Sequence, residues 1–110
     1  MFSRPGWSFT FALGDDPVTT LTVLDNTKPE RINLQPGTVF IGRAMDNDVK
    51  LQDKLISAHH AKIVTCFDAS YIEDLSSTNG TFLNGKRVRM HTLHPGDEIT
   101  VGHRRMVVNG

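Results

Sequence analysis

Apolar residues alternate with polar or small residues along almost the whole chain, and this period of two limits the possible folds more than any other feature. It is plain in Leu21 to Val23, in Ala61 to Cys66 and in Met106 to Val108. A strand places successive side chains on opposite faces, so this period is typical of strands buried on one side. No segment keeps the period of about 3.6 residues that an amphipathic helix needs. We therefore predict an all-β chain.

Short turns separate the apolar runs. Pro36-Gly37 and Pro95-Gly96-Asp97 each precede a run, and Asp15-Asp16-Pro17 separates the first two. The dipeptides Asn79-Gly80 and Asn84-Gly85 accept positive φ at little cost, and they bracket a very short strand over residues 81–83. Many short strands with closely spaced turns indicate a β-sandwich or a β-barrel.

The size and charge of the chain exclude several classes of protein. Its 110 residues suffice for one domain with its own core, and 38% hydrophobic against 22% charged residues is typical of a globular protein. Lys and Arg number 12 and Asp and Glu number 12, so the basic excess of a general nucleic-acid or membrane-surface binder is missing. The basic runs 86–89 and 103–105 are interpreted as solvated strand faces. No apolar run is long enough to cross a membrane.

The single cysteine, Cys66, excludes an intramolecular disulfide. We expect it to be a small buried side chain, because it lies in an alternating run and no cationic residue adjoins it. These features favour a reducing, cytoplasmic compartment. We divide the chain into residues 1–16, an N-terminal extension or added strand that carries Trp7, Phe9 and Phe11, and a domain over residues 17–110.

Polar residues and glycines gather in three segments between the predicted strands. The first runs from Gly42 to Val49, the second from Ile56 to His60 and the third from Asp74 to Gly85. The loops of a sandwich cluster at its two ends, so segments that are distant in sequence can converge there.

If the three segments meet, their side chains suit a phosphate dianion. The guanidinium of Arg43 can hold two phosphate oxygens in a bidentate fork. The hydroxyls of Ser57 and Thr78, with loop amides, can donate to the remaining oxygen. No carboxylate pair, activated nucleophile or cluster of metal ligands stands beside them, so the sequence predicts binding without catalysis, metal or cofactor.

The same segments carry a family resemblance. Gly42-Arg43 with Asn47-Asp48-Val49 is followed by Ser57-x-x-His60, by Ser77-Thr78-Asn79-Gly80-Thr81 and by Pro95-Gly96-Asp97. In this order and spacing they resemble the forkhead-associated (FHA) domain over about residues 21–108. The resemblance implies a β-sandwich of two mostly antiparallel sheets with about 10–12 short strands. It also implies a signalling module that binds phosphothreonine peptides with loops at one end.

The resemblance gives roles to individual residues. Those that would contact the phosphate are Arg43, Ser57 and Thr78, while Asn79 would hydrogen-bond the peptide backbone. Those that would shape or brace the loops are Gly42, His60 and Gly80. The implied partner is a phosphothreonine-containing protein, the substrate of a Ser/Thr kinase, with no role for nucleic acid or a membrane.

One position departs from the family pattern. Many members carry a polar or basic residue directly after the serine, whereas this chain has Ala58, so either affinity is reduced or Lys54 or His59 compensates. Leu55 lies near the place where the family often selects the third residue after the phosphothreonine, and it suggests an apolar preference there. The candidate specificity residues are thus Leu55, Ala58 and His59.

Plainer interpretations stand beside these roles. Ser57 could cap a turn, and Thr78-Asn79 could be turn chemistry alone. The alternative function is a scaffold of the same fold that binds partners without phosphate, for which Trp7, Phe9 and Phe11 would supply apolar surface. Dephosphorylating a partner would separate the two functions, because only the phosphate-dependent complex would dissociate.

Overall fold

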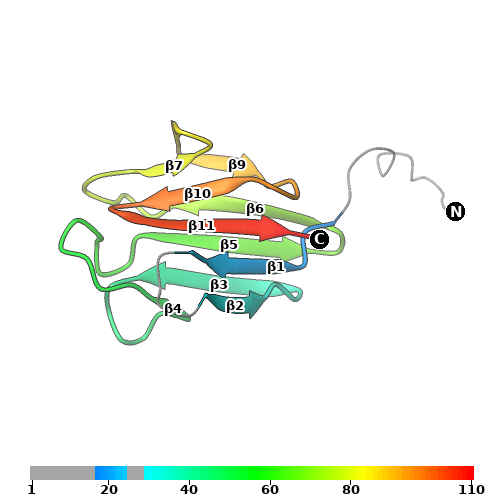
Figure 1. The fold of residues 1–110 in the computed structure, drawn as a ribbon, viewed down its shortest axis with the longest axis horizontal. Coiled ribbons are helices and arrows are strands. Elements are labelled where there is room, and N and C mark those ends of the chain that lie inside the picture. The colour runs from blue at the N-terminus through cyan, green and yellow to red at the C-terminus, as the bar shows by residue number, and fades with distance from the viewer. Residues whose placement is uncertain (1–16, 25–28) are drawn as a thin grey trace, which may run out of the picture.

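Every regular element of the described chain is a strand (Figure 1). The computed structural model describes residues 17–24 and 29–110, so the expected added strand over residues 1–16 lies outside the described residues. The strands are β1 (Thr20–Val23), β2 (Glu30–Asn33), β3 (Gly37–Gly42), β4 (Val49–Lys50), β5 (Ala61–Cys66), β6 (Ala69–Asp74), β7 (Thr81–Leu83), β8 (Lys86–Val88), β9 (Met90–Thr92), β10 (Glu98–Val101) and β11 (Arg104–Asn109). No described helix is long and apolar enough to span a membrane.

The strands form two sheets around one core. One sheet has the order β2-β1-β11-β10-β7-β8, and the other has the order β4-β3-β5-β6-β9. The pairs are antiparallel except for β3 and β4, which run parallel with Ile41 opposite Val49. The prediction of a sandwich of two mostly antiparallel sheets is confirmed.

The period of two places apolar side chains between the sheets. In β5, Ala61, Ile63 and Thr65 are buried, while the residues between them are more exposed. Leu21 from one sheet and Ile72 from the other are fully buried in the same cluster. Burying one such Leu or Ile contributes about 1.5–3 kcal/mol relative to leaving it exposed. This core fixes the strand ends, and thereby the points from which the loops start.

The prediction that Cys66 is buried is wrong, because Cys66 is exposed. It is the last residue of β5, directly after the buried Thr65. Since successive side chains of a strand point to opposite faces, the alternation that buries Ile63 and Thr65 turns the next side chain outward.

The β7–β8 hairpin closes at the predicted Asn-Gly turn. Asn84 has a φ of 51° and Gly85 has a φ of 87°. Positive φ at both central residues is the geometry of a type I′ turn, whose twist matches that of the strands. At the other Asn-Gly pair only Gly80 has a positive φ, of 95°, so that pair belongs to a loop and not to a two-residue hairpin.

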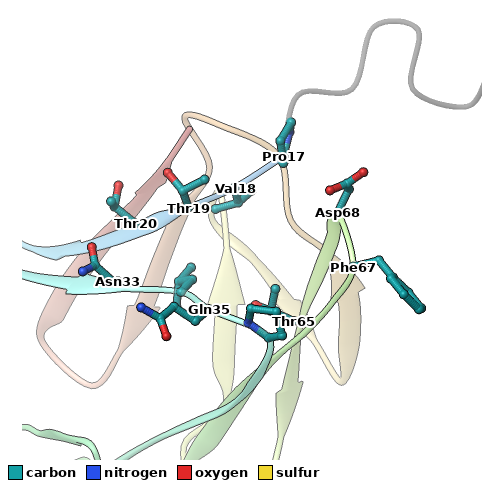
Figure 2. Close-up of a pocket in the computed structure, with 11 residues that line it drawn as sticks. Pro17, Val18, Thr19, Thr20, Asn33, Gln35, Thr65, Phe67 and Asp68 are labelled. Carbon is teal, nitrogen blue, oxygen red and sulfur yellow. The ribbon is translucent and has the colours of Figure 1, made fainter.

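The connections between strands gather at the two ends of the sandwich (Figure 1). At one end, named the loop end, lie residues 43–48, 51–60, 75–80 and 102–103. At the other, named the turn end, lie the β5–β6 turn, Pro17 and Gly110. A hollow of about 410 Å³ opens at the turn end (Figure 2). Phe67 borders it and is 90% exposed.

Candidate functional site

Hydrogen bonds join the three predicted loop segments at the loop end. The amide of Arg43 donates to the carbonyl of Ser57 over 3.1 Å, which links the β3–β4 loop to the β4–β5 loop. The amide of Thr78, in the β6–β7 loop, donates to Oγ of Ser57 over 3.1 Å. Nδ2 of Asn79 donates to the carbonyl of Leu55 over 2.9 Å. The structure thus brings Arg43, Ser57 and Thr78 together at one rim.

This rim exposes hydrogen-bond donors that no other described group uses. The Arg43 side chain is exposed, with no hydrogen-bond or ion-pair partner in the described chain. Ser57 is half-buried, and because its Oγ accepts from Thr78, its own proton can be donated outward. Thr78 is itself exposed. A guanidinium fork beside hydroxyl donors is a set that fits a phosphate group.

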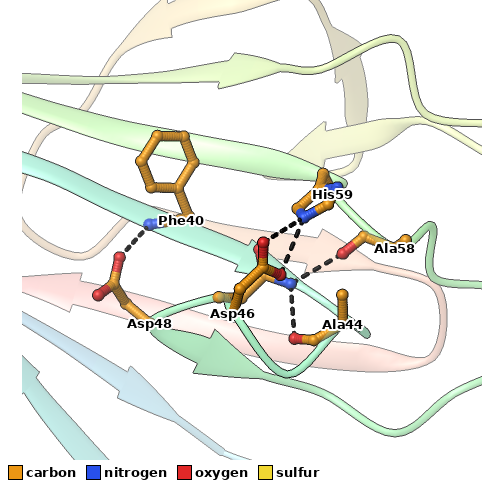
Figure 3. Close-up of polar contacts among 7 residues, drawn as sticks. Phe40, Ala44, Asp46, Asp48, Ala58 and His59 are labelled. Carbon is orange, nitrogen blue, oxygen red and sulfur yellow. Dashed lines mark hydrogen bonds and ion pairs between the residues drawn. The ribbon is translucent and has the colours of Figure 1, made fainter.

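Close packing beneath the rim requires a glycine at position 42. A Cβ atom at Gly42 would lie 2.3 Å from the carbonyl O of Ala58 and 2.8 Å from Nδ2 of Asn47. Asn47 is only 3% exposed, and its Nδ2 donates to the carbonyls of Ala44 and Ala58, each over 2.8 Å (Figure 3). Asn47 thereby ties two loops together below Arg43. The sequence motif contains Asn47, but the prediction gave it no role.

His60 is fully buried and connects the β4–β5 loop to the β6–β7 loop. The amide of Ser57 donates to Nδ1 of His60 over 3.0 Å, and Nε2 of His60 lies 2.8 Å from the carbonyl O of Gly80. A carbonyl only accepts, so Nε2 carries the proton and Nδ1 is the acceptor. The imidazole is therefore neutral in this arrangement, and each nitrogen holds the backbone of a different loop.

Asp74 organises the β6–β7 loop from the end of β6. Its Oδ1 accepts from Oγ of Ser77 over 2.6 Å and from Oγ1 of Thr81 over 2.7 Å, while its Oδ2 accepts from the Ser77 amide over 3.0 Å. Burial raises the pKa of the Asp74 carboxyl, but these three hydrogen bonds together outweigh it and leave the pKa below its ordinary value. Oγ of Ser77 in turn accepts from the amide of Gly80 over 2.9 Å.

Asp53 attaches the β10–β11 turn to the β4–β5 loop. Its carboxylate accepts from the amide of Leu55 over 3.0 Å, and from the amide and Nδ1 of His103 over 2.7 and 3.0 Å. The amides of Leu55 and His103 hold the pKa of Asp53 below its ordinary value. The turn lies so close that a Cβ at Gly102 would be 2.8 Å from Cγ1 of Ile56. Sequence reasoning missed this contact, because it joins residues 50 positions apart.

The three candidate specificity residues lie around the rim. Leu55 is half-buried, whereas Ala58 and His59 are exposed. The ring of His59 is held by Asp46, whose two carboxylate oxygens lie 2.9 and 3.0 Å from Nε2 (Figure 3). Lys54 is exposed on the same β4–β5 loop.

Comparison with known proteins gives consistent matches. A family model described as FHA domain matches residues 39–102. An ABC transporter ATP-binding/permease protein of Mycobacterium tuberculosis is 45% identical over 82 residues, which are 73% of this chain and 10% of that protein. The chain thus spans only part of its relatives' length: 10% of this transporter protein and 56% of a 36% identical oxoglutarate dehydrogenase inhibitor of Corynebacterium jeikeium.

Solved structures match over most of the chain. One, from a structural and functional analysis of phosphothreonine-dependent FHA domain interactions, is 32% identical with a TM-score of 0.79 and covers 84% of this chain and 96% of that chain. Another is EmbR of Mycobacterium tuberculosis in complex with a low-affinity phosphopeptide. It is 32% identical with a TM-score of 0.76 and covers 89% of this chain and 26% of that chain.

Proposed function

We propose that this chain, which belongs to the FHA domain family, binds phosphothreonine peptides and recruits phosphorylated proteins through its loop end. The observation that supports the proposal is the rim at which hydrogen bonds from backbone amides join the loops of Arg43, Ser57 and Thr78, with the Arg43 side chain exposed and unpaired in the described chain. Related domains of known structure are described as phosphothreonine-dependent. The partner is accordingly a phosphothreonine-containing substrate of a Ser/Thr kinase.

Each rim residue has a distinct part in this binding. Arg43 holds two phosphate oxygens, while Ser57 and Thr78 donate to the third. Asn79 then bonds the peptide backbone, although this requires its Nδ2 to share or exchange its present contact with Leu55.

The residues beneath the rim keep these donors in place. Gly42 allows the β3–β4 loop to pass against the carbonyl of Ala58. His60 fixes the backbone at Ser57 and Gly80 at the same time. Preorganisation of this kind raises affinity by reducing the entropy lost on binding.

The specificity of the module is assigned to Leu55, Ala58 and His59, which border the rim. Leu55 offers an apolar contact for a residue that follows the phosphothreonine. Ala58 supplies no polar contact, so any compensating donor comes from His59, which Asp46 positions, or from Lys54.

We assign the chain a binding role without catalysis, metal or cofactor. The described rim holds hydrogen-bond donors and no pair of acid and base directed at a common point. The described residues also include no group of three or more His, Cys, Asp or Glu that could hold a metal ion. A cytoplasmic place for the domain agrees with a kinase substrate as its partner.

A binding screen with a degenerate library of phosphothreonine peptides first selects a ligand. Titration calorimetry then compares the affinity of that peptide for the wild-type protein and for the Arg43→Ala variant. A charge-assisted hydrogen bond is worth about 1.5–3 kcal/mol, so loss of a bidentate contact weakens binding about 100-fold or more. The control is Arg105→Ala, which removes an arginine from β11 in the opposite sheet. Unchanged affinity in Arg43→Ala would remove this guanidinium from the site.

A second candidate function is a scaffold that binds partners without phosphate. The observation that favours it is Phe67, which is almost fully exposed beside the hollow at the turn end (Figure 2). A protein partner that stays bound after phosphatase treatment, and that is released by Phe67→Ala, would support this function in place of the first.

A further inference from the structure

A second group of arginines lies beside the rim and has no part in the function proposed above. Arg87 in β8 and Arg89 just after it border a hollow of about 370 Å³. The residues that line this hollow are Asp74, Ser76, Ser77, Arg87, Val88 and Arg89. Both arginines are exposed, and although the chain bends at Arg89 as it passes from one sheet to the other, both residues line this same hollow.

Positive charge in this hollow exceeds negative charge. Neither guanidinium has a hydrogen-bond or ion-pair partner among residues 17–24 and 29–110. The one carboxylate that lines the hollow, Asp74, is already bonded to Ser77 and Thr81. The neighbouring Glu73 pairs with Lys62 at 3.6 Å. Two guanidiniums therefore remain available to an incoming anion.

The hollow adjoins the phosphate-binding rim through the β6–β7 loop. Ser77 lines the hollow and directly precedes Thr78 of the rim. The guanidinium of Arg87 packs over Gly80, where an added Cβ would lie 2.6 Å from Nε of Arg87. The carbonyl of Arg89 accepts from the amide of Asp74 over 2.8 Å, which fixes the backbone of Arg89 to the base of the same loop.

We propose that Arg87 and Arg89 form a second anion subsite, which takes an acidic side chain of the same peptide whose phosphothreonine lies at Arg43. The ligand is a carboxylate or a second phosphate, since a guanidinium binds both in the same forked geometry. This inference rests on the proposed function. An extended peptide advances about 3.3 Å per residue, so the acidic residue follows or precedes the phosphothreonine by a few positions.

A purely structural role for Arg87 makes a different prediction. If Arg87 only supports the β6–β7 loop by packing on Gly80, its removal weakens every phosphopeptide by the same factor. If it binds an acidic group, its removal weakens only those peptides that carry the group. The quantity to measure is therefore the affinity gain from the acidic residue, and not affinity alone.

The experiment uses titration calorimetry with phosphothreonine peptides that have neutral flanks, and with versions that place Glu or phosphoserine at each of the flanking positions in turn. We expect the peptide with the acidic residue at one of these positions to bind about 5- to 20-fold more tightly than the neutral peptide, in line with one or two added charge-assisted contacts at an exposed site.

This gain in affinity should disappear in the double variant Arg87→Gln/Arg89→Gln and shrink as ionic strength rises. It should persist in Arg31→Gln, because β2 and β8 lie at opposite edges of their sheet.

The outcomes separate the inference from the function on which it rests. A gain with phosphoserine alone identifies the ligand as a second phosphate, and a gain with Glu as well identifies it as any acidic side chain. The inference is overturned if the neutral phosphopeptide binds but no flanking position improves it, or if the double variant keeps the gain. Equal losses for all peptides would assign Arg87 to loop support. Absence of binding by every phosphopeptide would instead contradict the proposed function.

Discussion

The loop end and the β5–β6 turn at the opposite end rest on the same strands and the same core, yet they are held in different ways. At the loop end, Asn47, Asp53, His60 and Asp74 each bond the backbone of a loop segment. At the turn end, the β5–β6 connection is a short turn beside which Thr65 and Ser70 share one hydroxyl hydrogen bond of 2.8 Å.

The difference follows from the length of the connections. A short turn is fixed by the strands it joins, whereas each residue of a longer loop costs about 1–2 kcal/mol to order. Buried polar side chains offset that cost at the loop end and leave the rim donors in defined positions. We therefore expect the loop end to be sensitive to single polar substitutions and the β5–β6 turn to tolerate them.

The largest expected effect is that of His60→Ala. The substitution leaves a cavity and two backbone groups, the amide of Ser57 and the carbonyl of Gly80, without partners. We expect the free energy of unfolding to fall by about 3–5 kcal/mol, measured by urea denaturation. The control His91→Ala, at an exposed position of β9, should change it by less than about 0.5 kcal/mol. Equal effects of the two substitutions would contradict the bracing role of His60.

Gly42→Ala should have the next largest effect. Its Cβ meets the backbone carbonyl of Ala58 at 2.3 Å, so the two loops must separate. We expect a loss of about 1–3 kcal/mol in stability together with weaker phosphopeptide binding, because Arg43 and Ser57 move apart. If binding measured by calorimetry stays unchanged in a folded Gly42→Ala protein, the close packing has no part in positioning the rim.

The free energy of unfolding should fall at acid pH because Asp53 and Asp74 at the loop end become protonated. Both carboxyls have a pKa below the ordinary value of 3.8 in the folded protein. The two ionised carboxylates therefore contribute fully to the free energy of unfolding when the pH is above 3.8. Their contribution is lost as the pH falls from 3.8 through the lower pKa values of the folded protein, because over that range the unfolded chain binds more protons than the folded chain. Asp74→Asn should cost about 1–2 kcal/mol at neutral pH. It should also reduce the loss of stability between neutral pH and about pH 3, measured by urea denaturation at each pH. An unchanged acid loss would contradict the role of this carboxylate.

The smallest effect is expected at the turn end. Phe67 has a φ of 57° and an exposed side chain, so Phe67→Asn removes backbone strain without removing packing. We expect a gain in stability below about 1 kcal/mol and no change in phosphopeptide affinity. A clear loss of stability would show that the exposed ring has a structural role and would weaken the contrast between the two ends.

The fold was largely predictable because alternation records which face of a strand is buried. The bounds of β5 and β7 agree with the alternating runs, whereas β4 and β9 were not predicted. A strand of two residues such as β4 is too short to show a period, and all three residues of β9 are exposed. The error at Cys66 arose because Val64 and Cys66 are apolar although they share the more exposed face of β5, so hydrophobicity did not distinguish the two faces at that end.

The polar supports of the candidate site were harder to predict than its rim. Arg43, Ser57 and Thr78 could be named from motif spacing. The contacts of Asp53 with His103 and of Asn79 with Leu55 join positions that are far apart in sequence, and no local pattern reports them. The order of the strands within each sheet decides which loops meet. That order cannot be predicted from the sequence of any single segment.

Pro17 and Gly110 lie next to each other at the turn end, since a Cβ at Gly110 would be 3.1 Å from the carbonyl O of Pro17. Adjacent attachment points on the face away from the rim are the geometry that permits a domain to be inserted into a host protein or anchored to a sensor surface. Immobilised through either point, the domain would present its loop end outward, so a biosensor built this way needs no long spacer.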